Sequence, residues 1–149
     1  MSFTALQASA YLHHLHFHTP EPEKLAAWYG STMEMKAEAL SSGVWLVSGP
    51  ARQILFSAGE AKKLVHASFA VRDAEALEGL RARAAERGLA PRPVDAPLFQ
   101  ASAFAVDDPD GNTIYFGLAL SDAVRMLRGR RGPVQHLTLA SRDPEAIPA

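Results

Sequence analysis

The sequence contains no cysteine, carries almost no net charge and has no long hydrophobic run. Without cysteine, disulfides, thiolate metal ligands and a cysteine nucleophile are excluded. A formal net charge of −1 over 149 residues gives no bulk attraction to nucleic acid or to an anionic membrane. No apolar stretch approaches the length of a membrane span, and residues 1–10 lack the basic start and apolar core of a secretion signal. These absences predict a cytoplasmic protein with no nucleic-acid or membrane partner.

A motif that begins with histidine occurs three times along the chain. Segments 14–23, 66–75 and 136–145 each start with His, continue through alternating residues, and reach an acidic residue followed two positions later by Glu. Internal repeats indicate copies of one supersecondary unit. Hydrophobic residues make up 48% of the chain, which is enough to bury a core around such units. Because the third copy breaks off at Ala149, the sequence predicts two complete units and the opening of a third.

The first unit is predicted to be a strand, a helix and three further strands. Aromatic, alternating residues favour a strand over 11–19. Pro22 suits the first position of a helix. Leu25 and Tyr29 then share one face of that helix, which is predicted to end near Gly30. The further strands are predicted at 33–39, 43–47 and 53–57.

The second unit repeats that order. Asp73 is a favoured residue for the N-terminal cap of the helix, and Gly88 for its end. The segment 108–112, Asp-Pro-Asp-Gly-Asn, predicts a tight turn between the last two strands. The strands of this unit are predicted at 65–71, 91–94, 101–106 and 113–118.

The repeated order predicts an α+β fold in which two βαβββ modules form a curved mixed sheet around a cleft. Residues 1–120 would hold the paired modules, at about 11–57 and 65–118. Residues 121–133 are predicted to form a linker helix, and residues 134–149 the first strand of an incomplete third module.

Histidines fall on one face of the predicted sheet. Because side chains alternate along a strand, His14, His16 and His18 share a face. Leu15 and Phe17 lie on the other face and are expected to contact the core under the helix. The residues predicted to line the hollow of the sheet are His14, His66, Tyr115, Trp45, His18 and Ser68.

These features resemble the vicinal oxygen chelate superfamily, which includes glyoxalase I, bleomycin-resistance proteins and type I extradiol dioxygenases. The resemblance rests on the two βαβββ units, on the His near the start of each, and on the turn 108–112 ahead of an apolar strand. It implies that His14 or His66 is a metal ligand in metal-using members, and that the position of Tyr115 is normally a Glu. Two His and one carboxylate suit non-haem Fe(II), whereas tyrosine is neutral at pH 7.

The third copy of the motif favours one branch of that superfamily. In extradiol dioxygenases with four units, the resemblance implies that the first pair keeps the fold without metal and the second pair holds the iron. The chain is therefore interpreted as the N-terminal, metal-free half of an Fe(II)-dependent extradiol dioxygenase-like protein acting on catecholic diols. His136 would be the first iron ligand, and this half alone would be inactive and hold no tightly bound cofactor.

Two other functions stay open at this point. A protein of the bleomycin-resistance type would bind a small aromatic or amphipathic ligand without catalysis. A glyoxalase-type metal isomerase or lyase would use His14, His16 and His66. A homo-oligomer is expected, because such units can pair between chains. On the metal-free interpretation, His14→Ala or His66→Ala should change stability little, and Tyr115→Glu should tighten the binding of a divalent ion.

Overall fold

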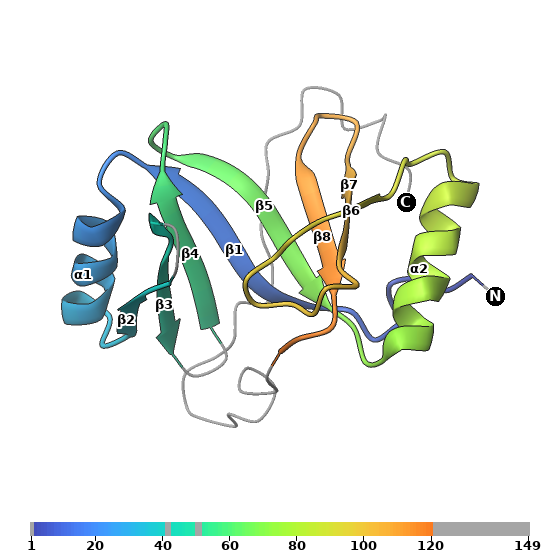
Figure 1. The fold of residues 1–149 in the computed structure, drawn as a ribbon, viewed down its shortest axis with the longest axis horizontal. Coiled ribbons are helices and arrows are strands. Elements are labelled where there is room, and N and C mark those ends of the chain that lie inside the picture. The colour runs from blue at the N-terminus through green and yellow to red at the C-terminus, as the bar shows by residue number, and fades with distance from the viewer. Residues whose placement is uncertain (1, 41–42, 50–51, 121–149) are drawn as a thin grey trace. The chain divides into compact units, whose positions relative to one another are not determined.

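The computed structural model describes residues 2–40, 43–49 and 52–120, and these residues form the order βαβββ twice (Figure 1). The predicted α+β class is confirmed. The first module consists of β1 (Tyr11–Thr19), α1 (Pro22–Thr32), β2 (Lys36–Ala39), β3 (Trp45–Gly49) and β4 (Arg52–Ala58). The second consists of β5 (Lys63–Ala70), α2 (Ala74–Glu86), β6 (Arg92–Pro93), β7 (Phe104–Asp107) and β8 (Thr113–Gly117). The predicted linker helix at 121–133, the strand in 134–149 and His136 lie outside the described residues.

The largest boundary differences are at the starts of β2 and β7. The helix α1 continues past Gly30 to Thr32, and the Ser31 hydroxyl donates to the Trp28 carbonyl within it (3.2 Å). The strand β2 therefore begins at Lys36, three residues later than predicted. The strand β7 is also three residues later, because residues 101 and 102 form a turn.

Backbone pairing places the strands in the order β2-β3-β4-β1-β5-β8-β7-β6. The order within each module is the same, β1-β4-β3-β2 and β5-β8-β7-β6, as a duplicated unit predicts. β1 and β4 are parallel, whereas β2, β3 and β4, and likewise β6, β7 and β8, pair antiparallel, so the sheet is mixed. The cleft depends on how the two compact units lie relative to each other, and it stays a prediction.

Residues 13–67 form one compact unit, in which α1 packs on one face of the sheet (Figure 1). Ala26 of α1 is fully buried against Val47 and Phe56. A small side chain at this position lets the helix approach the strands closely, and the larger apolar residues around it complete the core. These are Phe17, Leu25, Tyr29, Met35, Trp45 and Ile54.

Strand register fixes which residues of this unit face α1. Phe17 and Trp45 both pair with Phe56, so all three lie on the α1 face. His16 pairs with Leu55, the neighbour of Phe56, so His16 and Leu55 lie on the opposite face. The predicted division of the first strand into a histidine face and a helix-facing face is therefore correct.

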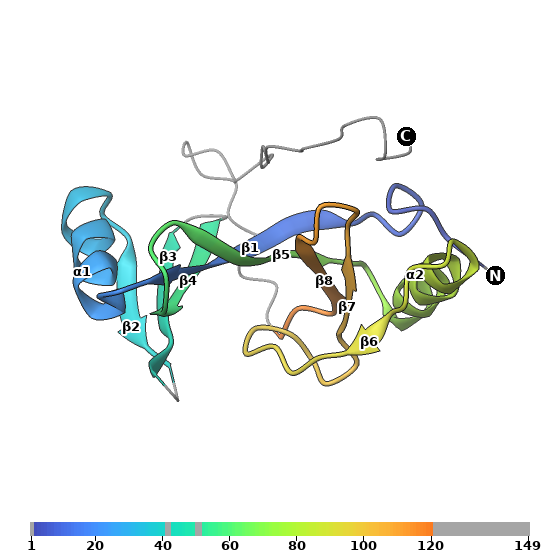
Figure 2. The same ribbon diagram turned by 90° about the horizontal axis from the view of Figure 1, so that it is seen from above.

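Residues 2–12 and 68–120 form the second compact unit, whose sheet is covered on both faces. One face is covered by α2 (Figure 2), whose Leu77 packs in a core that includes Phe104. On the other face, Phe99 comes from the connection between β6 and β7 and packs against Ala70 of β5. In this unit, apolar side chains therefore cover the face of the sheet that corresponds to the histidine face of the first module.

The predicted residues begin and end the helix α2 and form the turn between the last two strands of this unit. Asp73 caps α2 by accepting from Ala76 N (2.8 Å). Gly88 has φ +74°, a left-handed conformation that glycine adopts without strain after a helix. Asp108 Oδ1 accepts from Asn112 N (2.8 Å) and closes the turn between β7 and β8.

Candidate functional site

Three predicted site residues, His14, His16 and His66, lie together in the unit of residues 13–67. The ring centroids of His16 and His66 are 5.0 Å apart, and His16 Nδ1 lies 3.2 Å from His66 Nε2. The rings of His14 and His66 meet edge to face, with centroids 5.7 Å apart. We refer to these three residues as the histidine cluster.

Two residues that the sequence interpretation missed extend the histidine cluster. His13 Nδ1 lies 2.8 Å from His14 Nδ1, and His16 Nε2 lies 2.8 Å from Ser57 Oγ. Simple alternation along a strand places His13 on the face opposite His14, so it offers no signal for this contact. Ser57 could be found only from the register of β1 with β4, which places it beside the histidines.

Burial keeps these imidazoles neutral at pH 7. The pKa of His14 is lowered from 6.5 to about 2, mainly by burial and also by the neighbouring imidazoles His13, His66 and His16. Burial is also the main cause that lowers the pKa of His66 to about 3 and the pKa values of His13 and His16 to about 4. Each ring therefore has one N–H and one acceptor nitrogen.

The contacts of His16 allow two arrangements of protons. His16 can donate from Nδ1 to His66 and accept from the Ser57 hydroxyl, or it can accept from His66 and donate to Ser57. The chain of hydrogen bonds from Ser57 through His16 to His66 thus has the order of a nucleophile, a base and an orienting group. A pKa of about 4 makes His16 a weak base at neutral pH. The arrangement is therefore one of shared protons rather than an activated serine.

The histidine cluster lies in a buried setting. His14 and His66 are only 1% and 3% exposed, and His14 is among the largest fully buried side chains of the described chain. The expectation that His14→Ala or His66→Ala would change stability little assumed open, solvated side chains. Truncating a large buried side chain leaves a cavity, and this typically lowers the free energy of unfolding by about 2–5 kcal/mol. That expectation is therefore reversed.

The histidine cluster does not fit Fe(II) as it is placed. A metal needs a free lone pair from each ligand, but one proton lies between His16 Nδ1 and His66 Nε2. Within residues 2–40, 43–49 and 52–120, no group of three His, Asp or Glu side chains is arranged to hold a metal ion. The set His14, His16 and His66 is thus brought together, but His16 and His66 direct a nitrogen at each other, and His14 directs Nδ1 at His13.

The position expected for the acidic ligand is apolar in both modules. Tyr115 of β8 packs with Ala70 and Phe99, and burial raises the pKa of its phenol. The segment 53–56 aligns with 113–116, so Leu55 is its counterpart in β4, and Leu55 is fully buried. Tyr115 is only partly buried, and the charges of Arg92 and Asp107 also act on its phenol. The expected gain of metal binding in Tyr115→Glu stays a prediction.

Trp45, His18 and Ser68 were also predicted to line the hollow. For Trp45 this was wrong, because it lies on the α1 face beside Phe56. His18 is partly buried at the end of β1, with its ring centroid 6.1 Å from that of His16. Ser68 is fully buried in β5, on the same side of the strand as His66.

Comparison with known proteins rests on the fold. No protein-family model matches the sequence, and no curated protein matches it in sequence. Among solved structures, homoprotocatechuate 2,3-dioxygenase from Brevibacterium fuscum gives a TM-score of 0.66 at 14% identity, over 78% of this chain and 34% of that one. A 2,3-dioxygenase from Pseudomonas sp. KL28 gives 0.62 at 16% identity, over 72% and 42%. The described chain has the vicinal oxygen chelate fold.

The chain spans between 34% and 42% of the length of these dioxygenases. The similarity to the structure of NAD-dependent benzaldehyde dehydrogenase from Legionella pneumophila instead extends over most of that chain. There the similarity covers 71% of this chain and 97% of that one, with a TM-score of 0.51 and 14% identity. The fold is thus shared with proteins of different lengths, and at these identities it does not assign an activity.

Proposed function

We propose that this chain is the metal-free, N-terminal module pair of an extradiol dioxygenase-like protein that cleaves catecholic diols. In this proposal Fe(II) and O₂ bind in a further module pair, where His136 is the first ligand. The iron would bind the diol and oxygen, and both oxygen atoms would enter the product. The part of residues 2–120 would be structural, through packing against the catalytic pair.

One observation carries this proposal: neither module has a carboxylate at the position where the superfamily places one. Leu55 and Tyr115 occupy the two copies of that position; Leu55 is fully buried, and Tyr115 is partly buried against Phe99. A ligand set of two His and one carboxylate is what non-haem Fe(II) oxygenases use. The histidine cluster would have to break its internal hydrogen bonds to bind a metal, and it would still lack the acid. The similarity to extradiol dioxygenase structures supports the same proposal at the level of the fold.

The test compares the 149-residue chain with the protein translated from the whole gene. After anaerobic loading with Fe(II), we expect less than about 0.1 iron per 149-residue chain and no ring cleavage of catechol. We expect close to one iron and measurable cleavage in the whole-gene protein, lost in His136→Ala and retained in His66→Ala variants that still fold. Stoichiometric iron in the 149-residue chain would contradict the proposal, and so would a coding sequence that ends at Ala149.

A second candidate is a small-molecule-binding protein without catalysis. It is favoured by a cavity of about 520 Å³ in the unit of residues 13–67, bordered by Trp45. Cavities of this size are typical of small-ligand sites. Under this candidate the 149-residue chain binds a small aromatic or amphipathic ligand by itself, and no iron is needed.

For both candidates, we also propose a cellular location and an oligomeric state. None of the described helices is long and apolar enough to span a bilayer. We place the protein in the cytoplasm, as a homo-oligomer with no nucleic-acid or membrane partner. Size-exclusion chromatography with light scattering tests the oligomer directly, since a monomer at micromolar concentration would contradict it.

A further inference from the structure

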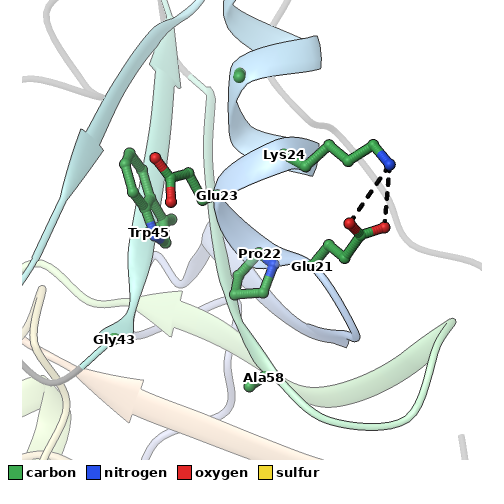
Figure 3. A pocket seen from close by; sticks show the side chains of 8 residues that line it. Glu21, Pro22, Glu23, Lys24, Gly43, Trp45 and Ala58 are labelled. Atoms are coloured by element: carbon green, nitrogen blue, oxygen red, sulfur yellow. Dashed lines mark hydrogen bonds and ion pairs between the residues drawn. The ribbon is translucent and has the colours of Figure 1, made fainter.

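A cavity lies between the start of α1 and the sheet, on the face opposite the histidine cluster. Trp45 of β3 forms one wall, and the first turn of α1 forms another (Figure 3). Its volume is about 520 Å³, and small side chains keep it open. The lining residues are Glu21, Pro22, Glu23, Lys24, Ala27, Gly43, Trp45 and Ala58.

The wall formed by Trp45 is rigid and apolar. Trp45 packs against the core around Val47 and Phe56, so this contact holds the indole in place. The same side chain is only partly buried, and its remaining surface borders the cavity. Gly43 and Ala58 carry no side chain large enough to occupy the space in front of it. The cavity therefore presents an indole that is fixed before any ligand arrives.

The charged groups of the cavity leave one negative charge near this wall. Lys24 Nζ pairs with Glu21, 3.2 Å from Oε2, and both side chains are mostly exposed. In Figure 3 that ion pair points away from Trp45, whereas the Glu23 carboxylate points toward the indole. Within the part of the chain that the structure describes, Glu23 takes part in no ion pair.

From this arrangement we infer that the cavity binds a small organic cation of the alkylammonium or quaternary ammonium class. An indole attracts such a cation through its π face, and a carboxylate supplies the opposite charge. The first turn of a helix otherwise favours anions, but here Glu21 and Glu23 already carry negative charge there. Pro22 also removes one backbone N–H that an anion could use. The site is distinct from the histidine cluster and does not depend on the proposed dioxygenase function; it is the cavity that favours the second candidate, and the inference names a cation as its ligand.

The test uses choline and its neutral carbon isostere, in which a tert-butyl group replaces the trimethylammonium group. The chain has two tryptophans, so the Trp28→Phe variant makes Trp45 the sole indole reporter. Trp28 is half exposed and does not border this cavity. We expect choline to change Trp45 emission saturably in the millimolar range. The neutral isostere should bind roughly tenfold more weakly, which corresponds to about 1.4 kcal/mol.

Two matched glutamate variants test which carboxylate interacts with the bound cation. Glu23→Gln in the Trp28→Phe background should weaken choline binding roughly tenfold and leave the isostere unchanged. Glu21→Gln, two residues earlier and at a carboxylate that pairs with Lys24, should change choline binding less than about twofold. Both substitutions are on exposed side chains, so circular dichroism should show unchanged folding. Equal affinity for choline and the isostere, equal effects of the two variants, or no saturation would each overturn the inference.

Discussion

The buried histidines should make the stability of this protein fall steeply in mild acid. In an unfolded chain a histidine has a pKa of about 6.5. In the folded protein burial lowers the pKa of His14 to about 2 and that of His66 to about 3. Between those values the unfolded state binds more protons, so the free energy of unfolding rises with pH. Their neutral forms therefore stabilise the fold fully above about pH 6.5, and this is lost as the pH falls toward the folded-state values.

The size of the loss at pH 5 depends only on the unfolded state. At this pH both folded imidazoles are still neutral, so their own pKa values do not enter. Each pH unit below about 6.5 lowers the free energy of unfolding by about 1.4 kcal/mol per histidine. Moving from about pH 7.5 to about pH 5 should therefore remove about 2 kcal/mol for His14 and about 2 kcal/mol for His66. A small domain has only about 5–15 kcal/mol in total.

Urea unfolding at the two pH values, followed by circular dichroism, measures this difference. His14→Gln or His66→Gln should each reduce the pH-dependent change by about 2 kcal/mol, whatever the variant does to stability at neutral pH. His18→Gln, in the same strand and only partly buried, is the matched control. If a variant does not fold, imidazole NMR of the parent gives an independent reading, since His14 and His66 should be neutral at about pH 5. Imidazolium signals for both at that pH, or a pH dependence unchanged in both variants, would refute the reasoning.

Two further predictions concern helix capping and close packing. Asp73→Ala removes the side chain that caps α2 and should lower the free energy of unfolding by about 1 kcal/mol, read from the urea midpoint. Glu21→Ala at the start of α1 should have little effect, because Glu21 makes no side-chain capping bond. Gly117→Ala should lower the free energy of unfolding by about 1–3 kcal/mol, because its Cβ would clash with the ring of Phe99. Gly30→Ala, with no contact under 3.4 Å, is the control, and an equal or smaller effect at Gly117 would contradict the packing argument.

Most of the fold could be predicted because local signals and the repeat agree. The cap at Asp73 and the turn at 108–112 act within a few residues, and both form as the sequence indicates. The duplicated order of elements follows from the repeated motif, because each copy folds to the same topology. The start of β2 was missed, since the end of a helix depends on hydrogen bonds such as that of Ser31, which pattern alone does not specify.

The candidate site was predicted only in part, because it depends on pairing between strands. Alternation placed His14 and His16 on one face, and the repeat predicted that His66 joins them, as it does from a strand 50 residues away from His16. Ser57 required the register of β1 with β4. Trp45 was assigned to the wrong face because alternation shows only which residues of a strand share a face, whereas the register of β3 with β4 decides which face that is.

The two modules also show why a shared fold does not preserve a shared site. The strand order repeats, so His14 and His66 stand at corresponding places, as do Leu55 and Tyr115. With no carboxylate at the second pair of positions, ionised histidines have no counter-charge there, and burial stabilises their neutral forms instead. Neutral imidazoles can then satisfy one another by hydrogen bonds, as His16 and His66 do. Without an acid at Leu55 or Tyr115, the neutral histidines thus form a buried hydrogen-bonded group, while the strand order of the two modules is the same.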